Sequence, residues 1–273
     1  MKKILLLCAL IANALTVLAG GEFTIASLFL NGEIAAMDNI VDTLNTVEGV
    51  TATGTITYNE STKTLTLNQS SIIISDSKNI LRTNSWAEDV TIELIGENTF
   101  QNTSDTYEIA FRLIGGATNS VTITGEGSLS ISTKKWYPIS LESGSLTIRN
   151  TTVIACSEDS RYGIQTEVRG HGDLYIENAN VEAAGIRNLA SITLTDCYIK
   201  QPIDAEVVYD ESECEIDKKG STENIIIVPG KKPEGTALEN ISTTPSPTKC
   251  MKNGQIVITT NEKIYNTAGQ EIK

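Results

Sequence analysis

Val121-Thr122-Ile123 is one copy of the apolar-polar-apolar triplet that decides the fold of this chain. The triplet occurs six times, as Leu65-Thr66-Leu67, Val90-Thr91-Ile92, Val121-Thr122-Ile123, Leu146-Thr147-Ile148, Leu174-Tyr175-Ile176 and Ile192-Thr193-Leu194. Successive copies are 25, 31, 25, 28 and 18 residues apart. Spacings of this size are typical of solenoids, in which neighbouring repeats stack to complete a shared core.

Two further apolar positions recur in step with the triplet. An isoleucine precedes the next triplet at Ile80, Ile109, Ile139, Ile164 and Ile186. Another apolar residue follows the triplet by seven or eight positions, at Ile72, Leu129, Val153, Val181 and Ile199. Strands this short with long returns are naturally parallel, and parallel crossovers are right-handed. We therefore predict an all-β fold, a right-handed parallel β-helix whose triplets turn their middle Thr outward.

The rest of the chain divides by composition. Lys2 and Lys3, the apolar residues 4–18 and the small-residue site Val17-Leu18-Ala19 predict a signal peptide over 1–19, and thus secretion to the medium or the outer cell surface. We expect an N-terminal cap at 20–53, the β-helix at 54–228, a linker at 229–250 and a small β-hairpin at 251–273. No later apolar run approaches the roughly 20 residues that cross a bilayer.

The charge of the chain limits its partners. Without Lys2 and Lys3 it has 19 basic and 34 acidic side chains, a net charge of −15. Nucleic acid is a poor partner for such a surface, because phosphate binding needs clustered Lys and Arg. An acidic polysaccharide would also be repelled unless a divalent cation lay between the two like charges.

Four cysteines remain outside the predicted signal peptide, Cys156, Cys197, Cys214 and Cys250. They could form structural disulfides in an oxidising compartment or remain buried free thiols, and the sequence leaves both open. Their spacing fits no zinc site, since there is no C-x-x-C and only one His.

Two stretches resemble a known group of proteins. Residues 58–67 (YNESTKTLTL) and 94–99 (LIGENT), together with the recurrent Val/Leu-Thr-Ile, resemble bacterial surface proteins described as carbohydrate-binding-domain-containing. The likeness covers residues 28 to about 203. It implies a right-handed parallel β-helix, and binding of a plant cell-wall polysaccharide with calcium present. Residues 251–273, which end in IYNTAGQEIK, resemble the sorting module of the type IX secretion route, and this likeness implies delivery to the outer surface or the medium.

Aromatic side chains are the candidate carbohydrate-binding groups, because an aromatic ring offers an apolar face to a sugar. Trp136 has outward parity beside Pro138, and Trp86 lies in a turn. Tyr107, Tyr137 and Tyr162 each stand two residues before a repeated isoleucine and would stack along the axis. Their parity is that of the inward isoleucine, so they fill the core or a corner unless the backbone bends there.

Carboxylates crowd the segment after the last triplet. Asp204, Glu206, Asp210, Glu211 and Glu213 could supply oxygen ligands to Ca²⁺, although their spacing is not that of an EF-hand. The alternative is a solvated acidic edge that discourages end-to-end stacking. The outward column of Thr66, Thr91, Thr122, Thr147 and Thr193 is interpreted as a solvated β face, because the neighbouring column is charged and irregular.

The sequence thus favours a non-catalytic module that binds a polysaccharide, with Ca²⁺ as a possible ligand and no other cofactor. A polysaccharide lyase is one alternative, with Arg149, Arg161 or Arg169 as the base beside clustered carboxylates. His171, the single imidazole, lacks a recognisable nucleophile near it in sequence. A structural adhesin that contacts protein is the other alternative. Fold alone does not decide between them.

Overall fold

A computed structural model describes most of the chain between residues 23 and 233. The described ranges are 23–30, 32–83, 89–106, 108–114, 119–158, 163–210 and 212–233, with the strand backbone at 248–252, 255–260, 263–265 and 271–272. The chain forms two compact units, residues 1–232 and residues 233–273.

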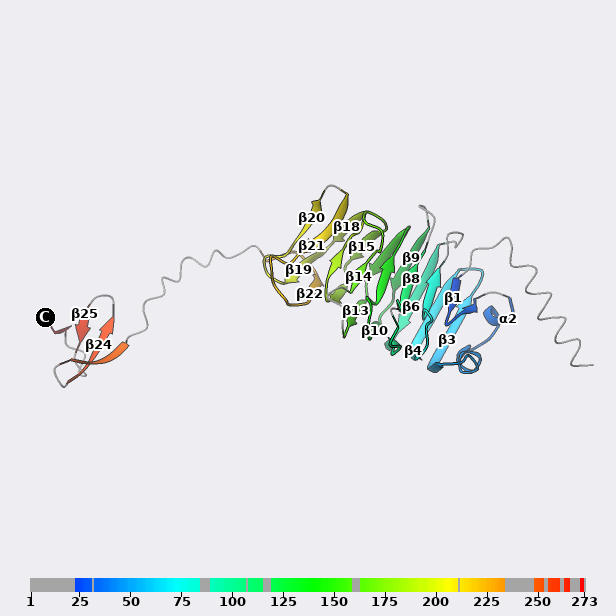
Figure 1. The fold of residues 1–273 in the computed structure, drawn as a ribbon, viewed down its shortest axis with the longest axis horizontal. Helices are drawn as coiled ribbons and strands as arrows, with labels where there is room; N and C mark the ends of the chain where they lie inside the picture. Colours follow the sequence, from blue (N-terminus) through cyan, green and yellow to red (C-terminus); the bar gives the residue numbers. More distant parts are fainter. Residues whose placement is uncertain are drawn as a thin grey trace, which may run out of the picture. The chain divides into compact units, whose positions relative to one another are not determined.

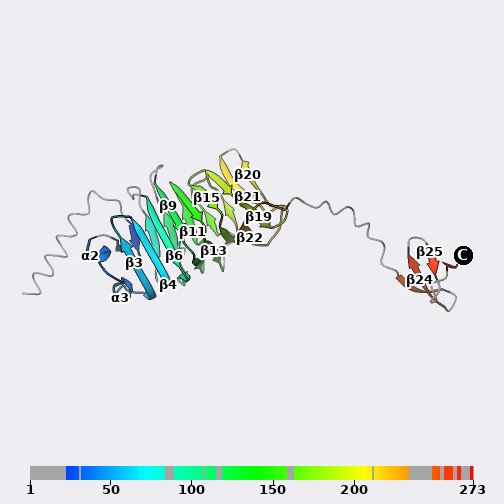
Figure 2. The ribbon, with the colours of Figure 1, turned by 180° about the vertical axis from the view of Figure 1, so that it is seen from behind.

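The first unit is a parallel β-solenoid of about four turns, which confirms the predicted fold class (Figures 1 and 2). Each turn supplies three strands, and each of the three sets stacks in parallel. The set we call sheet A contains β5 (Leu81–Thr83), β8 (Phe111–Leu113), β11 (Ile139–Leu141), β14 (Ile164–Gln165) and β17 (Ile186–Arg187). The triplet face contains β6 (Val90–Ile95), β9 (Ser120–Thr124), β12 (Ser145–Arg149), β15 (Asp173–Glu177) and β18 (Ser191–Thr195). The third face contains β7 (Glu97–Asn102), β10 (Ser128–Thr133), β13 (Thr152–Ser157) and β16 (Asn180–Ala183).

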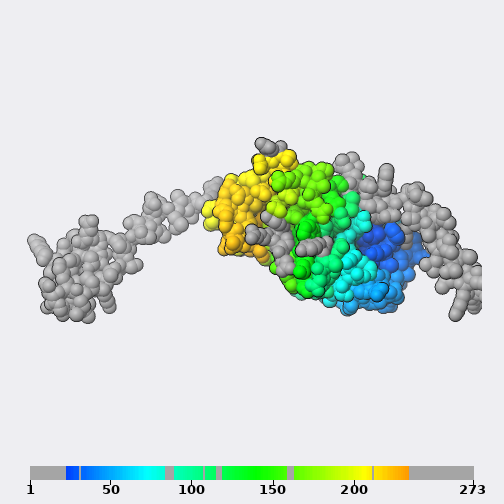
Figure 3. Space-filling view, viewed as in Figure 1, coloured from blue at the N-terminus to red at the C-terminus, as the bar shows by residue number. Residues whose placement is uncertain are grey.

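The triplets lie in register and supply much of the core. Val90 pairs with Val121, and Val121 pairs with Leu146 on the next strand. These side chains and the third residue of each described triplet from Ile92 to Ile176 are buried, whereas the middle residue faces out. Burying such a side chain contributes about 1.5–3 kcal/mol, so the repeated column stabilises the stack along its length. Figure 3 shows the sequence colours following in order along this unit, as expected where each turn contacts its neighbours.

The first triplet is displaced from the predicted column. Leu65 pairs with Ile92 rather than Val90, so Thr64 and not Thr66 lies beside Thr91. The reason is that β4 (Thr64–Ile74) is one long strand that joins the triplet face to the third face, with a positive φ of 47° at Gln69. This strand is also held in an antiparallel pair with β3 (Val50–Asn59), which constrains its register.

The isoleucine column in sheet A also needs a correction. Ile139 lies level with Phe111, and Phe111 lies level with Leu81. Ile80 and Ile109 are buried, but they come just before their strands begin. Because sheet A strands have only two or three residues, a pattern of isoleucines alone does not define their register.

Left-handed residues make the sharp corners between the triplet face and the third face. Gly96, Asn150, Asn178 and Asp196 occupy these corners with φ between 45° and 65°. Gly and Asn reach this region most easily, and Asn178 also donates from Nδ2 to Asn150 Oδ1 at 2.9 Å. At Gly127 a side chain is excluded for another reason, because a Cβ there would lie 2.3 Å from the Gly96 carbonyl oxygen.

The N-terminal cap contains two short helices and three strands. It consists of β1 (Phe23–Ile25), β2 (Leu28–Phe29), α2 (Gly32–Ala35), α3 (Val41–Leu44) and β3. β1 pairs antiparallel with β5 and extends sheet A, while β3 covers β4. Both edges of the first turn are therefore paired, which protects exposed backbone groups from further strand addition.

The C-terminal end of the solenoid is closed by a strand that runs backwards. β22 (Ile225–Pro229) inserts antiparallel between β16 and β19 (Cys197–Gln201). The hairpin of β20 (Glu206–Asp210) and β21 (Glu213–Asp217) lies against β17 and β18. Its buried Cys214 and Ile216 join the core.

The second unit is a four-stranded antiparallel sheet rather than the two-stranded hairpin expected from the sequence. Its strands are β23 (Thr248–Lys252), β24 (Gln255–Thr260), β25 (Lys263–Tyr265) and β26 (Glu271–Ile272). Within the part of the chain described by the structure, no helix has the length and apolar character needed to cross a bilayer.

Candidate ligand-binding face

The outer side of sheet A carries one side chain from each of six neighbouring strands. Each of these residues is in register with the next one along the stack. They are Thr24, Arg82, Arg112, Ser140, Gln165 and Arg187. Ile139 and Leu141 point into the core on either side of Ser140, so strand alternation turns this row away from the core. Arg82 is exposed and Arg112 and Arg187 are half-buried, whereas Ser140 and Gln165 in the middle of the row are only 0% and 7% exposed. With strands about 4.8 Å apart, the row from β5 to β17 is roughly 19 Å long.

The three arginines of this row have different partners. Arg112 donates from Nε to Glu142 Oε1 at 2.5 Å, and Arg187 donates from Nε to Gln165 Oε1 at 3.2 Å. Burial lowers the pKa of the Arg112 guanidinium, but the hydrogen bond and charge of Glu142 more than offset this, so its pKa is raised. Arg82 is exposed and forms no ion pair with any residue in the described ranges. Among the three arginines of the row, Arg82 is therefore the one best placed to form an ion pair with a ligand.

Trp136 and Tyr137 lie beside the middle of this row. The backbone bends over residues 134–136, and the Tyr137 ring is buried with its hydroxyl facing the side chains of Gln165 and Glu167. Trp136 is half-buried, whereas Tyr137 is only 2% exposed, and their ring centroids are 5.1 Å apart. Trp136 is consequently the aromatic side chain of the two that a ligand can reach.

Two buried hydroxyls near this bend, those of Tyr137 and Ser140, form no hydrogen bond of normal geometry with the residues that the structure describes. Burial raises the pKa of Tyr137 to about 12, and the charge of Glu167 adds to the rise. A phenol with a raised pKa keeps its proton at neutral pH and is unsuited to act as a base. At neutral pH the Tyr137 hydroxyl can therefore act as a hydrogen-bond donor, but it is not suited to abstract a proton from a ligand.

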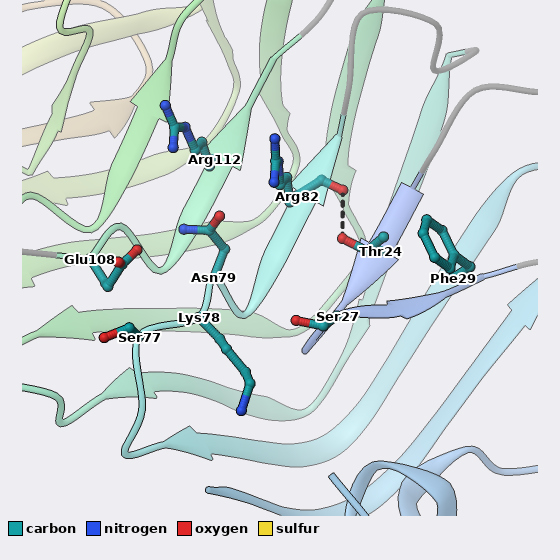
Figure 4. A pocket seen from close by; sticks show the side chains of 9 residues that line it. All are labelled: Thr24, Ser27, Phe29, Ser77, Lys78, Asn79, Arg82, Glu108 and Arg112. Atoms are coloured by element: carbon teal, nitrogen blue, oxygen red, sulfur yellow. Dashed lines mark hydrogen bonds between the residues drawn. The ribbon is translucent and has the colours of Figure 1, made fainter. Parts of the chain in front are cut away.

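A cavity lies at each end of sheet A. The N-terminal cavity has a volume of about 350 Å³, and its walls include Thr24, Ser27, Asn79, Arg82, Glu108 and Arg112 (Figure 4). The C-terminal cavity has a volume of about 630 Å³, and its walls include Ser157, Arg187, Glu215, Lys218, Thr222 and Asn224. The N-terminal cavity is the more polar of the two, since the C-terminal one is also lined by Ala184, Ile186 and Ile216. Each cavity includes an arginine of the row.

Several aromatic candidates cannot be placed. Trp86, Tyr107 and Tyr162 lie outside the described residues, as does Glu211 of the acidic segment. In sequence, however, Trp86 comes three residues after β5, Tyr107 four residues before β8, and Tyr162 two residues before β14. Every aromatic candidate is thus a close neighbour in sequence of a sheet A strand.

The triplet face shows the charged, irregular surface expected from its second outward column. Thr66 donates to Glu93 at 3.2 Å, and Arg149 Nε lies 2.5 Å from Glu177 Oε2. The outward residues in register with Thr91 include Tyr175, so the threonine column is interrupted. On this surface a charged side chain such as Arg149 on β12 forms an ion pair with Glu177 on the neighbouring strand β15.

The acidic segment forms the outer part of the β20–β21 hairpin. Lys219 lies 2.6 Å from Glu206 and 2.9 Å from Asp217, and hydrogen bonds with both raise its pKa. Asp204 and Asp210 are exposed, and Glu213 lies 3.5 Å from Arg169. Over the described ranges, no group of three or more His, Cys, Asp or Glu side chains is arranged to hold a metal ion. The proposed Ca²⁺ ligands are therefore not assembled by the residues that can be placed.

The candidate lyase bases are not gathered at one place. Arg149 pairs with Glu177 on the triplet face, Arg169 lies in the loop before β15, and Arg161 lies outside the described residues. His171 is exposed in the turn that follows Arg169. Cys156, Cys197 and Cys214 are free thiols, so none of these three forms a disulfide with another.

Sequence reasoning missed the three arginines of sheet A. The available signal was an apolar residue followed by Arg at the start of a strand, in Leu81-Arg82, Phe111-Arg112 and Ile186-Arg187. When the repeated isoleucines are aligned, the three arginines do not fall at the same position. The reason is that Ile80 and Ile109 precede their strands, whereas Ile186 is the first residue of its strand.

No protein-family model, curated protein or solved structure matches this chain.

Proposed function

We propose that this chain is a secreted, non-catalytic module that binds a polysaccharide along the outer side of sheet A. The observation that carries this proposal is the in-register row of polar side chains, with half-exposed Trp136 beside its middle strand and a cavity at each end. An extended polymer fits such a surface, because successive sugars meet successive strands.

The side chains of this face have suitable chemistry for sugars. An indole ring offers an apolar surface to the C–H face of a pyranose. Arg82, Arg112 and Arg187 can donate hydrogen bonds to hydroxyl groups in a fixed order along the stack. The strands that carry them are packed on the core through residues such as Ile139 and Leu141, so little ordering is required when the ligand binds.

The triplet face is a weaker candidate for the same ligand. Its outward Arg149 and Glu177 pair with each other, and Thr66 is bonded to Glu93. A ligand would have to replace these contacts before it gained its own. We therefore assign the polymer to sheet A and not to the more regular face.

A glycan array, probed with the purified chain in calcium and again in EDTA, tests the proposal. We expect retention of at least one plant cell-wall polysaccharide. Trp136→Ala should weaken that retention about tenfold or more, because a ring contact at the centre of a binding face contributes over 1 kcal/mol. Tyr175→Ala is the matched control, since Tyr175 is a half-buried outward aromatic on the triplet face.

The outcomes separate the alternatives. Silence on every glycan in both conditions would reject the proposal and favour an adhesin that contacts protein. Appearance of unsaturated product absorbance with pectin or alginate would show a lyase instead. Equal retention by the Trp136 and Tyr175 variants would place the ligand away from sheet A.

We also propose that residues 251–273 act as a sorting module for the type IX route. The support is that they belong to a compact unit, residues 233–273, distinct from the solenoid unit. Ending the chain at Lys232 should leave the solenoid folded but abolish its appearance in the medium of a host that has this route. Undiminished secretion of the shortened chain would reject this role.

A further inference from the structure

The cavity at the N-terminal end of sheet A is lined by three cationic side chains, although the chain as a whole has a net charge of −13. The cations are Lys78, Arg82 and Arg112, and the carboxylate of Glu108 lies on the same wall (Figure 4). The average charge of the protein is therefore a poor guide to the charge at this place.

The three cations are not equally available. Lys78 Nζ lies 2.7 Å from Asp76 and donates to the Glu48 carbonyl at 2.9 Å, and its side chain points away from both arginines in Figure 4. Arg112 is paired with Glu142. Arg82 alone among the three forms no ion pair within the described ranges, so its charge is the uncompensated one.

Arg82 and Arg112 are held side by side. Their Cα atoms are partners on adjacent parallel strands, which lie about 4.8 Å apart, and both guanidinium groups extend to the same side in Figure 4. Like charges this close repel each other, and Glu142 neutralises only one of them. An anion beside both guanidiniums would relieve the repulsion and accept charge-assisted hydrogen bonds from both forks.

The remaining walls suit a sugar that carries such an anion. The Ser27 hydroxyl is exposed, and the Phe29 side chain is 39% exposed at the opposite side of the cavity from Glu108. Thr24 and Asn79 are already bonded to backbone carbonyls of Arg82 and Ile109, which fixes their positions. Glu108 would repel an anion on its own side and so favours the side of Arg82.

We propose that this cavity binds an oxyanion substituent of the polysaccharide, a sulfate ester or a carboxylate, directly between Arg82 and Arg112 and without a metal ion. The sugar that carries the anion lies toward Phe29. This inference rests on the proposed function and adds to it the charge of the ligand. It also removes the need for a cation bridge to an acidic polymer at this end of the face.

The test uses three oligosaccharides with related backbones, one neutral, one sulfated and one built of uronic acids. Each is titrated calorimetrically into the full chain in EDTA at constant ionic strength. We expect a charged oligosaccharide to bind about tenfold or more tightly than the neutral one, since a hydrogen bond to a charged group commonly has that effect. The sulfated and uronate arms show which oxyanion the cavity prefers.

Arg82→Gln should abolish the preference for the charged oligosaccharide, so that this variant binds the charged and the neutral oligosaccharides with equal affinity. Arg82→Lys should restore part of the preference, because the charge remains but the fork is lost. Arg149→Gln on the triplet face is the control and should behave as the parent. A circular dichroism spectrum confirms that each variant is folded.

An equal affinity for all three oligosaccharides would overturn the inference and leave the proposed function standing. A full charge preference in Arg82→Gln would also overturn it. If no oligosaccharide binds, the cavity is still tested by inorganic sulfate. Sulfate should then raise the melting temperature of the parent more than that of Arg82→Gln, and an equal effect on both would reject the anion site.

Discussion

The triplet face and sheet A are built from the same turns but differ in what they present to solvent. Triplet-face strands have five or six residues, and the outward charges of Arg149 and Glu177 pair with each other. Sheet A strands have two or three residues, and their row includes Arg82, which forms no ion pair within the described ranges, and borders two cavities. The regular face builds the solenoid, whereas the short-stranded face has the features of a binding site.

The difference has a physical origin in strand length. A longer strand forms more ladder hydrogen bonds and buries more alternate side chains, so it stabilises the stack without help from its surface. Where a strand has only two or three residues, the segments that connect it to its neighbours in the chain are longer. These segments carry side chains such as Trp136 and Glu142 at the ends of the strand. The comparison therefore predicts that core changes on the triplet face affect stability most, while changes on sheet A affect binding and pH dependence.

The largest expected effect is a core truncation on the triplet face. Ile148 is fully buried, so Ile148→Ala should destabilise the solenoid by about 2–5 kcal/mol through lost burial and the cavity left behind. Urea unfolding followed by circular dichroism measures the change. The outward neighbour Thr147→Ala is the control, and a loss of similar size there would show that the two faces of the strand are not distinct.

The next effect is a pH dependence on sheet A. The pKa of Tyr137 is raised to about 12 in the folded chain, so between pH 10 and 12 the unfolded chain releases this proton first. Stability is therefore intact below pH 10 and should fall as the pH rises, by at most about 1.4 kcal/mol per pH unit. Unfolding at pH 8, 10, 11 and 12 measures this.

Tyr137→Phe should remove that part of the pH dependence. At pH 8 it should leave stability unchanged or slightly higher, because the deleted hydroxyl is buried and forms no hydrogen bond with the described residues. Tyr175→Phe on the triplet face is the control. A marked loss of stability in Tyr137→Phe at pH 8 would mean that the hydroxyl is bonded after all.

The smallest expected effect separates the ion pairs of the two faces. Arg112→Ala leaves the Glu142 carboxylate, whose side chain is 18% exposed, without its cation and should cost about 1–3 kcal/mol. Arg149→Ala removes a half-exposed arginine and should cost about 0–1 kcal/mol. Thermal unfolding of the two variants at low and high salt tests this order. Equal losses would mean that burial does not distinguish the pairs.

The solenoid architecture could be predicted from the sequence because buried residues recur at regular intervals. Val90, Val121 and Leu146 recur because each turn must bury the same position, and their column is present in the structure. The displaced first triplet was not predictable in the same way, because β4 takes its register from its antiparallel partner β3. The backward strand β22 was likewise visible as an apolar segment, but its direction and its place between β16 and β19 were not.

The candidate site was only partly visible. Trp136 could be chosen because an indole with outward parity is recognisable along a strand. The row of Arg82, Arg112 and Arg187 was not recognised, because these residues are 30 and 75 positions apart and their neighbours differ. The carboxylates that follow the last triplet suggested a calcium site from the sequence. In the folded hairpin, however, Lys219 forms ion pairs with Glu206 and Asp217.

The sequence by itself determined that the chain stacks short strands into a solenoid, because the same apolar spacing must return wherever the same core position is filled. Only the tertiary structure decided which outward side chains become neighbours and which charges are neutralised. The physical reason is that stacking about 4.8 Å apart brings together residues from separate turns, and their mutual contacts depend on register rather than on order along the chain.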